Sequence, residues 1–189
     1  KKSFQESILS FHKKDDDVSV YFITDKLESQ KLKFDIQLTD FSGKIHNKWE
    51  GEFLSNPNNS KEIYRINLSS LNIGSDYFND KYIYGTISVG DQTLSEKIEY
   101  LTSVKNLNLT SPKFNYQVNI VGNFYEIRLI SENLIKNLFI DSMLEDNFSD
   151  NYFDLRPNQE KVIRIKRDKL QSINSFTESL SFLSLYETY

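Results

Sequence analysis

The feature that most constrains this chain is a strict alternation of apolar and polar residues. In Leu32–Thr39 every second residue is apolar and each intervening residue is polar, so an extended segment would place one face on a core and the other in water. The 189-residue chain also has no alanine, the strongest helix former, and it contains 14 Phe and 11 Tyr, which favour strands. The sequence therefore predicts an all-β protein.

Strand-like segments form two sets along the chain. The first set comprises Ser7–His12, Val18–Thr24, Leu32–Thr39, Lys44–Phe53, Glu62–Leu68, Tyr82–Val89 and Leu94–Leu101. The second set comprises Tyr116–Val121, Phe124–Ile130, Ile135–Asp141, Lys161–Arg167 and Leu180–Tyr186. A single helical turn is predicted at most, at Ser131–Asn137 or at Leu170–Phe176. The number and spacing of strands in the first set are typical of an immunoglobulin-like sandwich.

The alternation lapses between Thr102 and Lys113, where polar residues and a proline lie. Such a stretch is typical of a linker between modules. We therefore predict two tandem immunoglobulin-like β-sandwich domains, at residues 1–104 and 105–189. The chain begins without Met, and this favours a segment of a longer parent. It contains no apolar run long enough for a membrane span.

Charge and residue inventory argue against several functions. A net charge of −4 disfavours nucleic acid as a partner, and the absence of cysteine excludes a thiol nucleophile. His12 and His46, the two histidines, are predicted to be solvated, and Asp15–Asp17 to point to solvent rather than bind calcium. Motifs for acyl or phosphoryl transfer are missing. The sequence thus indicates no catalytic, cofactor-binding or metal-binding residues and no cofactor.

Trp49 is the single tryptophan. It lies in register with the apolar residues Ile45 and Phe53, which favours a place in the core. An exposed, flat ring that binds sugar is the alternative interpretation.

The segment from Phe148 to Leu155, Phe-Ser-Asp-Asn-Tyr-Phe-Asp-Leu, is followed by Arg-Pro-Asn-Gln-Glu. It resembles the C-terminal immunoglobulin-like domain of β-mannosidases of glycoside hydrolase family 2, where Asn158 is usually Gly. The stretch from Val18 to Lys44 is similar to the preceding sandwich domain of the same enzymes. In this motif Asp150 and Asn151 suit a tight turn, while Tyr152, Phe153 and Leu155 are expected to be buried anchors.

The resemblance implies a non-catalytic C-terminal region of a retaining β-mannosidase, which hydrolyses terminal β-linked mannose in mannose-containing glycans. The catalytic glutamates of that family lie in a (β/α)₈ barrel, and no residue here matches them. The expected partner is therefore the parent's own barrel, with an extracytoplasmic location favoured for the parent. Two other interpretations stay open. One is an autonomous carbohydrate-binding module, which requires exposed aromatic residues; the other is an adhesion or scaffold pair.

Overall fold

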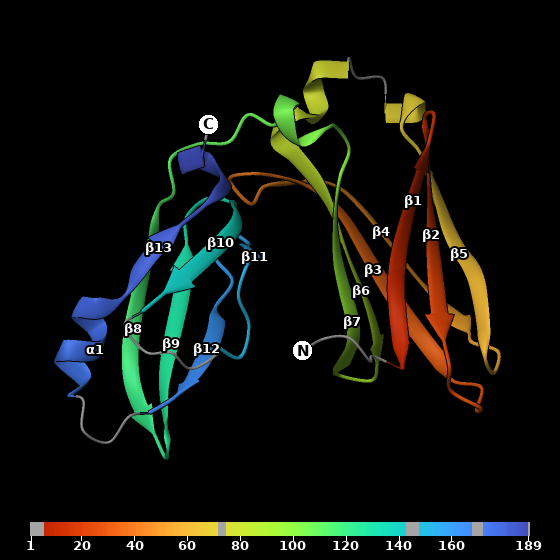
Figure 1. Cartoon of the computed structure of the whole chain (residues 1–189). Coiled ribbons are helices and arrows are strands. Elements are labelled where there is room, and N and C mark those ends of the chain that lie inside the picture. The colour runs from red at the N-terminus through yellow and green to blue at the C-terminus, as the bar shows by residue number, and fades with distance from the viewer. Residues whose placement is uncertain (1–5, 72–74, 143–147, 168–171, 189) are drawn as a thin grey trace. The chain divides into compact units, whose positions relative to one another are not determined.

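The computed structural model describes residues 6–71, 75–142, 148–167 and 172–188 (Figure 1). The chain consists of two compact units. The N-terminal unit comprises Lys2–Asp40 and Lys44–Asn108, and the C-terminal unit comprises Leu109–Tyr189 together with Phe41–Gly43. Each unit contains two sheets in which all paired strands are antiparallel. The prediction of an all-β chain with two sandwiches is confirmed.

The strands of the N-terminal unit match the first predicted set, with small differences at their ends. One sheet has the order β1-β2-β5, with β1 at Ser7–Lys14, β2 at Asp17–Thr24 and β5 at Asn59–Asn67. The other has the order β4-β3-β6-β7, with β3 at Lys31–Asp40, β4 at Ile45–Leu54, β6 at Lys81–Val89 and β7 at Gln92–Tyr100. Short 3₁₀ helices lie between β5 and β6, at Ser69–Leu71 and Ser75–Asp80, and after β7, at Val104–Asn106.

Alternation along β2 and β3 builds the core of this unit. Val18 and Val20 of β2 and Ile36 of β3 are completely buried. Along both strands, the buried apolar residues occupy every second position. Trp49 of β4 pairs with Ile36 and packs, half-buried, against this core. Trp49 thus lies at the margin of the core and is not fully buried within it.

The C-terminal unit has two three-stranded sheets. The first has the order β12-β9-β8, with β12 at Lys161–Lys166, β9 at Phe124–Ser131 and β8 at Phe114–Val121. The second has the order β11-β10-β13, with β11 at Phe153–Leu155, β10 at Ile135–Asp141 and β13 at Ser181–Leu183. Helix α1 at Ile173–Ser179 and the 3₁₀ helix η4 at Leu185–Thr188 complete the unit (Figure 1). No helix in the described ranges is both long and apolar enough to cross a membrane.

The second half of the chain departs from the predicted elements in four places. Residues 153–155 form a strand within the segment expected to be a turn, and the last predicted strand is reduced to Ser181–Leu183. The predicted helical turn at Ser131–Asn137 is wrong, because Ile135 begins β10. Helix α1 begins later than Leu170, which lies outside the described residues. Its start is fixed by Ser172, whose hydroxyl accepts a hydrogen bond from the Ser175 N–H at 3.1 Å.

Several turns adopt the left-handed conformation that their residues predict. Gly43, Gly90 and Gly122 have φ values of 92°, 53° and 60°, which only glycine adopts without steric cost. Asn158, which replaces the glycine usual in the mannosidase motif, has a φ of 57°. Asn tolerates this conformation better than other side chains, so the substitution preserves the turn.

The domain boundary is testable by limited proteolysis. Between β7 and β8 the chain contains only the 3₁₀ helix Val104–Asn106, and Lys105 and Lys113 are exposed there. We expect trypsin to cut first at these lysines and to leave two fragments that resist further digestion. Electrophoresis with mass spectrometry of the fragments gives the result. One protected fragment that spans residues 102–113 would contradict the proposed division.

Candidate functional site

The polar residues of the mannosidase-like motif bond to the backbone of neighbouring strands. The Asn151 side chain accepts a hydrogen bond from the Ile140 N–H at 2.8 Å and donates one to the Ile140 carbonyl at 2.7 Å. Ser149 Oγ accepts from the Arg164 N–H at 2.9 Å, and Asp154 accepts from the Asn137 N–H at 2.8 Å. These side chains join the motif to β10 and β12 and therefore have an architectural role.

The expected anchors of this motif differ in burial. Leu155 is only 2% exposed, and Phe153 packs half-buried against the core of the C-terminal unit. Tyr152, however, is 68% exposed, so its predicted burial is wrong. Tyr152 precedes Phe153, whose side chain faces the core, so the Tyr152 side chain lies on the other side of the chain, outside the sandwich. The φ of 57° at Tyr152 also turns the chain before β11 begins.

His46 also differs from the prediction. Its side chain is only 20% exposed. Its Nε2 lies 2.8 Å from Asp40 Oδ2, and its Nδ1 lies 3.0 Å from the Tyr77 hydroxyl. The physical reason is a β-bulge: Leu38 pairs with Asn47 but Thr39 pairs with Ile45, so His46 is the extra residue of β4. The same bulge removes Ile45 from the core face and leaves it 49% exposed.

The other candidate ligand residues remain separate. His12 is exposed, as predicted. Asp16 accepts a hydrogen bond from Ser69 Oγ at 2.6 Å, and Asp17 accepts one from Asn67 Nδ2 at 2.9 Å. Across the part of the chain that the structure describes, no group of three or more metal-ligating side chains is found.

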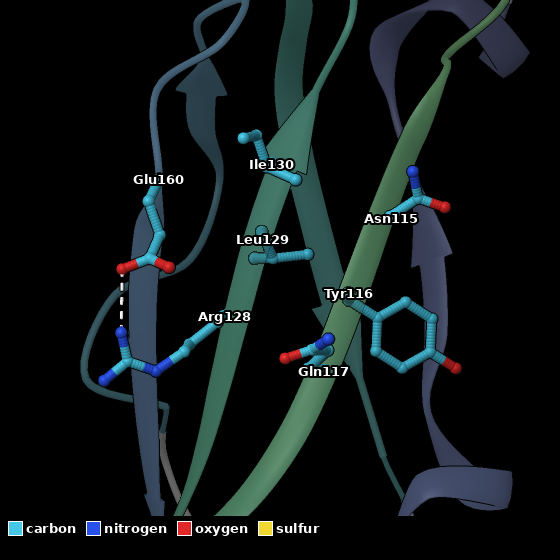
Figure 2. A pocket seen from close by; sticks show the side chains of 7 residues that line it. All are labelled: Asn115, Tyr116, Gln117, Arg128, Leu129, Ile130 and Glu160. Atoms are coloured by element: carbon cyan, nitrogen blue, oxygen red, sulfur yellow. Dashed lines mark hydrogen bonds and ion pairs between the residues drawn. The ribbon is translucent and has the colours of Figure 1, made fainter.

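A hollow of about 240 Å³ with a mixed apolar and polar lining lies over the sheet β12-β9-β8. Asn115 and Gln117 of β8 pair with Ile130 and Arg128 of β9 on the face turned away from the core. Figure 2 shows the Arg128 side chain extended toward Glu160, which precedes β12, and Arg128 Nη1 donates a hydrogen bond to Glu160 Oε2 at 2.8 Å. The hollow therefore offers amide and guanidinium groups around an exposed isoleucine.

Beside this hollow, a glutamate is buried on what would otherwise be a solvent-facing sheet surface. Glu126 is 2% exposed because two arginines cover it. Arg164 Nε donates to its Oε2 at 2.9 Å, and Arg128 Nη2 donates to its Oε1 at 2.6 Å. The hydrogen bonds from Arg164, and then those from Arg128, hold the pKa of Glu126 below its usual value.

This low pKa limits the chemistry of Glu126. The acid of a glycosidase needs a raised pKa so that it carries a proton near neutral pH. Glu126 is ionised under those conditions and is already paired with two cations. The arrangement is thus a stabilising ion network rather than an acid–base centre. The sequence shows Arg128 and Arg164 only as ordinary outward residues of two strands, so it does not reveal that they meet at Glu126.

The ion network predicts a specific acid sensitivity. Because the pKa of Glu126 is lowered on folding, its contribution to stability is complete above its usual value of 4.5 and is lost as the pH falls through the lowered folded value. We expect Glu126→Gln to destabilise the C-terminal unit at pH 7, with a difference from wild type that shrinks in acid. Urea unfolding across pH measures this. Glu160→Gln is the control, since its carboxylate is half-exposed at 51%. A Glu126→Gln deficit that does not change with pH would contradict the account.

Two family models match the chain. The Ig_mannosidase model, an Ig-fold domain, matches residues 109–188. The Mannosidase Ig/CBM-like domain model matches residues 16–106. Each of the two units therefore matches one mannosidase domain family, over residues 109–188 and 16–106. The resemblance to the C-terminal domains of β-mannosidases and the immunoglobulin-like class of both sandwiches are therefore confirmed. No curated protein matches this pair of mannosidase domains.

Solved structures share the fold of this mannosidase domain pair. The β-D-mannosidase of Dictyoglomus thermophilum matches with a TM-score of 0.78 and 18% identity, over 96% of this chain and 22% of that one. The exo-chitosanase CsxA of Amycolatopsis orientalis matches with a TM-score of 0.59 and 10% identity, over 93% of this chain and 25% of that one. At such identities the likeness shows the fold alone. The domain pair spans a quarter or less of the length of either enzyme.

Proposed function

We propose that this domain pair is the non-catalytic C-terminal accessory region of a retaining β-mannosidase. In this proposal it packs on a (β/α)₈ catalytic domain of a longer parent protein and stabilises it, and the parent hydrolyses terminal β-linked mannose in mannose-containing glycans. The tandem match of two mannosidase domain models, over residues 16–106 and 109–188, carries the proposal.

The chemistry of the described side chains supports a non-catalytic role. Retaining glycosidases use two carboxyl groups about 5 Å apart, one of them with a raised pKa. Among the described residues, Glu126 is the one buried carboxylate side chain, and Arg164 and Arg128 lower its pKa. Catalytic carboxylates would therefore come from the parent's barrel.

Assay of the purified chain tests the non-catalytic part of this proposal. We expect no turnover of an aryl β-mannoside above the rate without protein. Turnover that disappears when one of the chain's own carboxylates is replaced by the corresponding amide would overturn the proposal. A trace of contaminating glycosidase is distinguished because its activity would survive that replacement.

A further inference from the structure

Tyr152 has a backbone conformation that its residue type disfavours. The non-glycine residues described with a positive φ are Asp15, Asn58, Asn137, Tyr152 and Asn158. Asp and Asn tolerate the left-handed region because their short side chains bond locally, whereas a bulky aromatic residue there is an outlier. Such outliers concentrate at functional sites, so Tyr152 calls for an explanation beyond folding.

The local contacts of Tyr152 keep its ring in a fixed place. Its ring stacks on Phe139 with centroids 4.6 Å apart and planes inclined by 25°. Its N–H donates to Asn151 Oδ1 at 3.0 Å, and the same amide side chain is bonded to Ile140 of β10. The ring is nevertheless 68% exposed. A ligand that stacks on it would therefore lose little affinity to the ordering of a mobile side chain.

Tyr152 lies at one end of an apolar row on the outer face of the sheet β11-β10-β13. Phe139 pairs directly with Leu183 of β13, so the two side chains share this face, and Leu183 is 53% exposed. The next pair on this face, Asp141 with Ser181, is polar and exposed. Because neighbouring strands are about 4.8 Å apart, the row is about 10 Å long.

The size and edges of the row favour a small amphipathic ligand over another protein. A stable protein interface buries about 800 Å² on each partner, and a fully buried aromatic side chain supplies only about 150–250 Å². The surface area that the three partly exposed apolar side chains of the row can bury, beside Asp141 and Ser181, falls well short of about 800 Å². The flat C–H face of a hexopyranose, with hydroxyl groups around its edge, matches both the apolar row and its polar border.

We propose that Tyr152, Phe139 and Leu183 form a platform that binds a hexopyranose unit of a glycan chain. The choice of mannose-containing glycans rests on the proposed function, whereas the platform itself does not. Tyr152 supplies the stacking surface, Phe139 supports the ring from behind, and Leu183 extends the apolar row toward β13.

Calorimetric titration of the purified chain with β-1,4-linked mannohexaose tests this platform, with chitohexaose and cellohexaose as comparison ligands. We expect wild type to bind mannohexaose and Tyr152→Phe to bind it almost equally. Tyr152→Ala should weaken binding by up to about tenfold, which is the size of an aromatic stacking contribution. Tyr186→Ala is the matched control, because that tyrosine is 42% exposed and lies in η4.

Tyr152→Gly separates binding from folding. Glycine accepts the left-handed backbone without cost, so this variant should keep the thermal transition of wild type and still lose binding. If the chain binds chitohexaose or cellohexaose but not mannohexaose, the platform is supported. The choice of mannose-containing glycans, which rests on the proposed function, is then contradicted. Wild-type chain that binds none of the three sugars, or Tyr152→Gly that binds as wild type, would overturn the platform. Self-association that Tyr152→Gly abolishes, without sugar binding, would overturn it in favour of a contact between copies.

Discussion

Replacing Phe176 with alanine is expected to lower the free energy of unfolding of the C-terminal unit by about 3–5 kcal/mol. Phe176 of α1 is completely buried and stacks on Tyr125, which is also completely buried, with centroids 4.1 Å apart and planes inclined by 7°. The substitution removes this stacked ring and leaves a cavity. Urea unfolding followed by circular dichroism, which reports the strands of both units, measures the loss.

Phe153→Ala is the matched control for this prediction. Phe153 packs on the same core but is only half-buried, so its loss should be clearly smaller than that of Phe176. A Phe176→Ala protein that unfolds at the urea concentration of wild type would contradict the assigned core. Equal losses for the two variants would contradict the difference in burial.

Replacing Asn151 with alanine is expected to destabilise the C-terminal unit by about 3 kcal/mol, at about 1 kcal/mol for each of three lost hydrogen bonds. Its side chain accepts from the N–H groups of Ile140 and Tyr152 and donates to the Ile140 carbonyl. Asn151→Asp keeps both acceptor functions but loses the donor, so it should fall between alanine and wild type. Thermal unfolding of the three proteins gives the order. An aspartate variant less stable than the alanine variant would contradict the assigned bonds.

The strands were predictable from the sequence because burial on one face imposes a period of two. Leu32–Thr39 alternates in sequence, and β3 alternates in burial at the same positions. Strand β11 was missed because three residues are too short to show a period, and the turn residues Asp150 and Asn151 precede it. The signal for helix α1 was present in Ser172, whose side chain suits a helix start.

The special environments of single residues were not predictable, because they depend on partners distant in sequence. Glu126 has the alternation of a solvated carboxylate and is buried because Arg164, its direct partner in β12, and Arg128 cover it. The environment of His46 depends on a bulge of one residue, which alternation alone does not reveal. The exposure of Tyr152 follows from a positive φ that no general rule assigns to tyrosine.

The proposed accessory role is tested most directly in the longer parent, by its aryl β-mannosidase activity with and without these 189 residues. After incubation at rising temperature, we predict that the shortened enzyme loses activity at a lower temperature than the full-length enzyme. At low temperature both should hydrolyse the substrate. A parent without β-mannosidase activity, or a shortened enzyme that survives heating as well as the full-length one, would contradict the account.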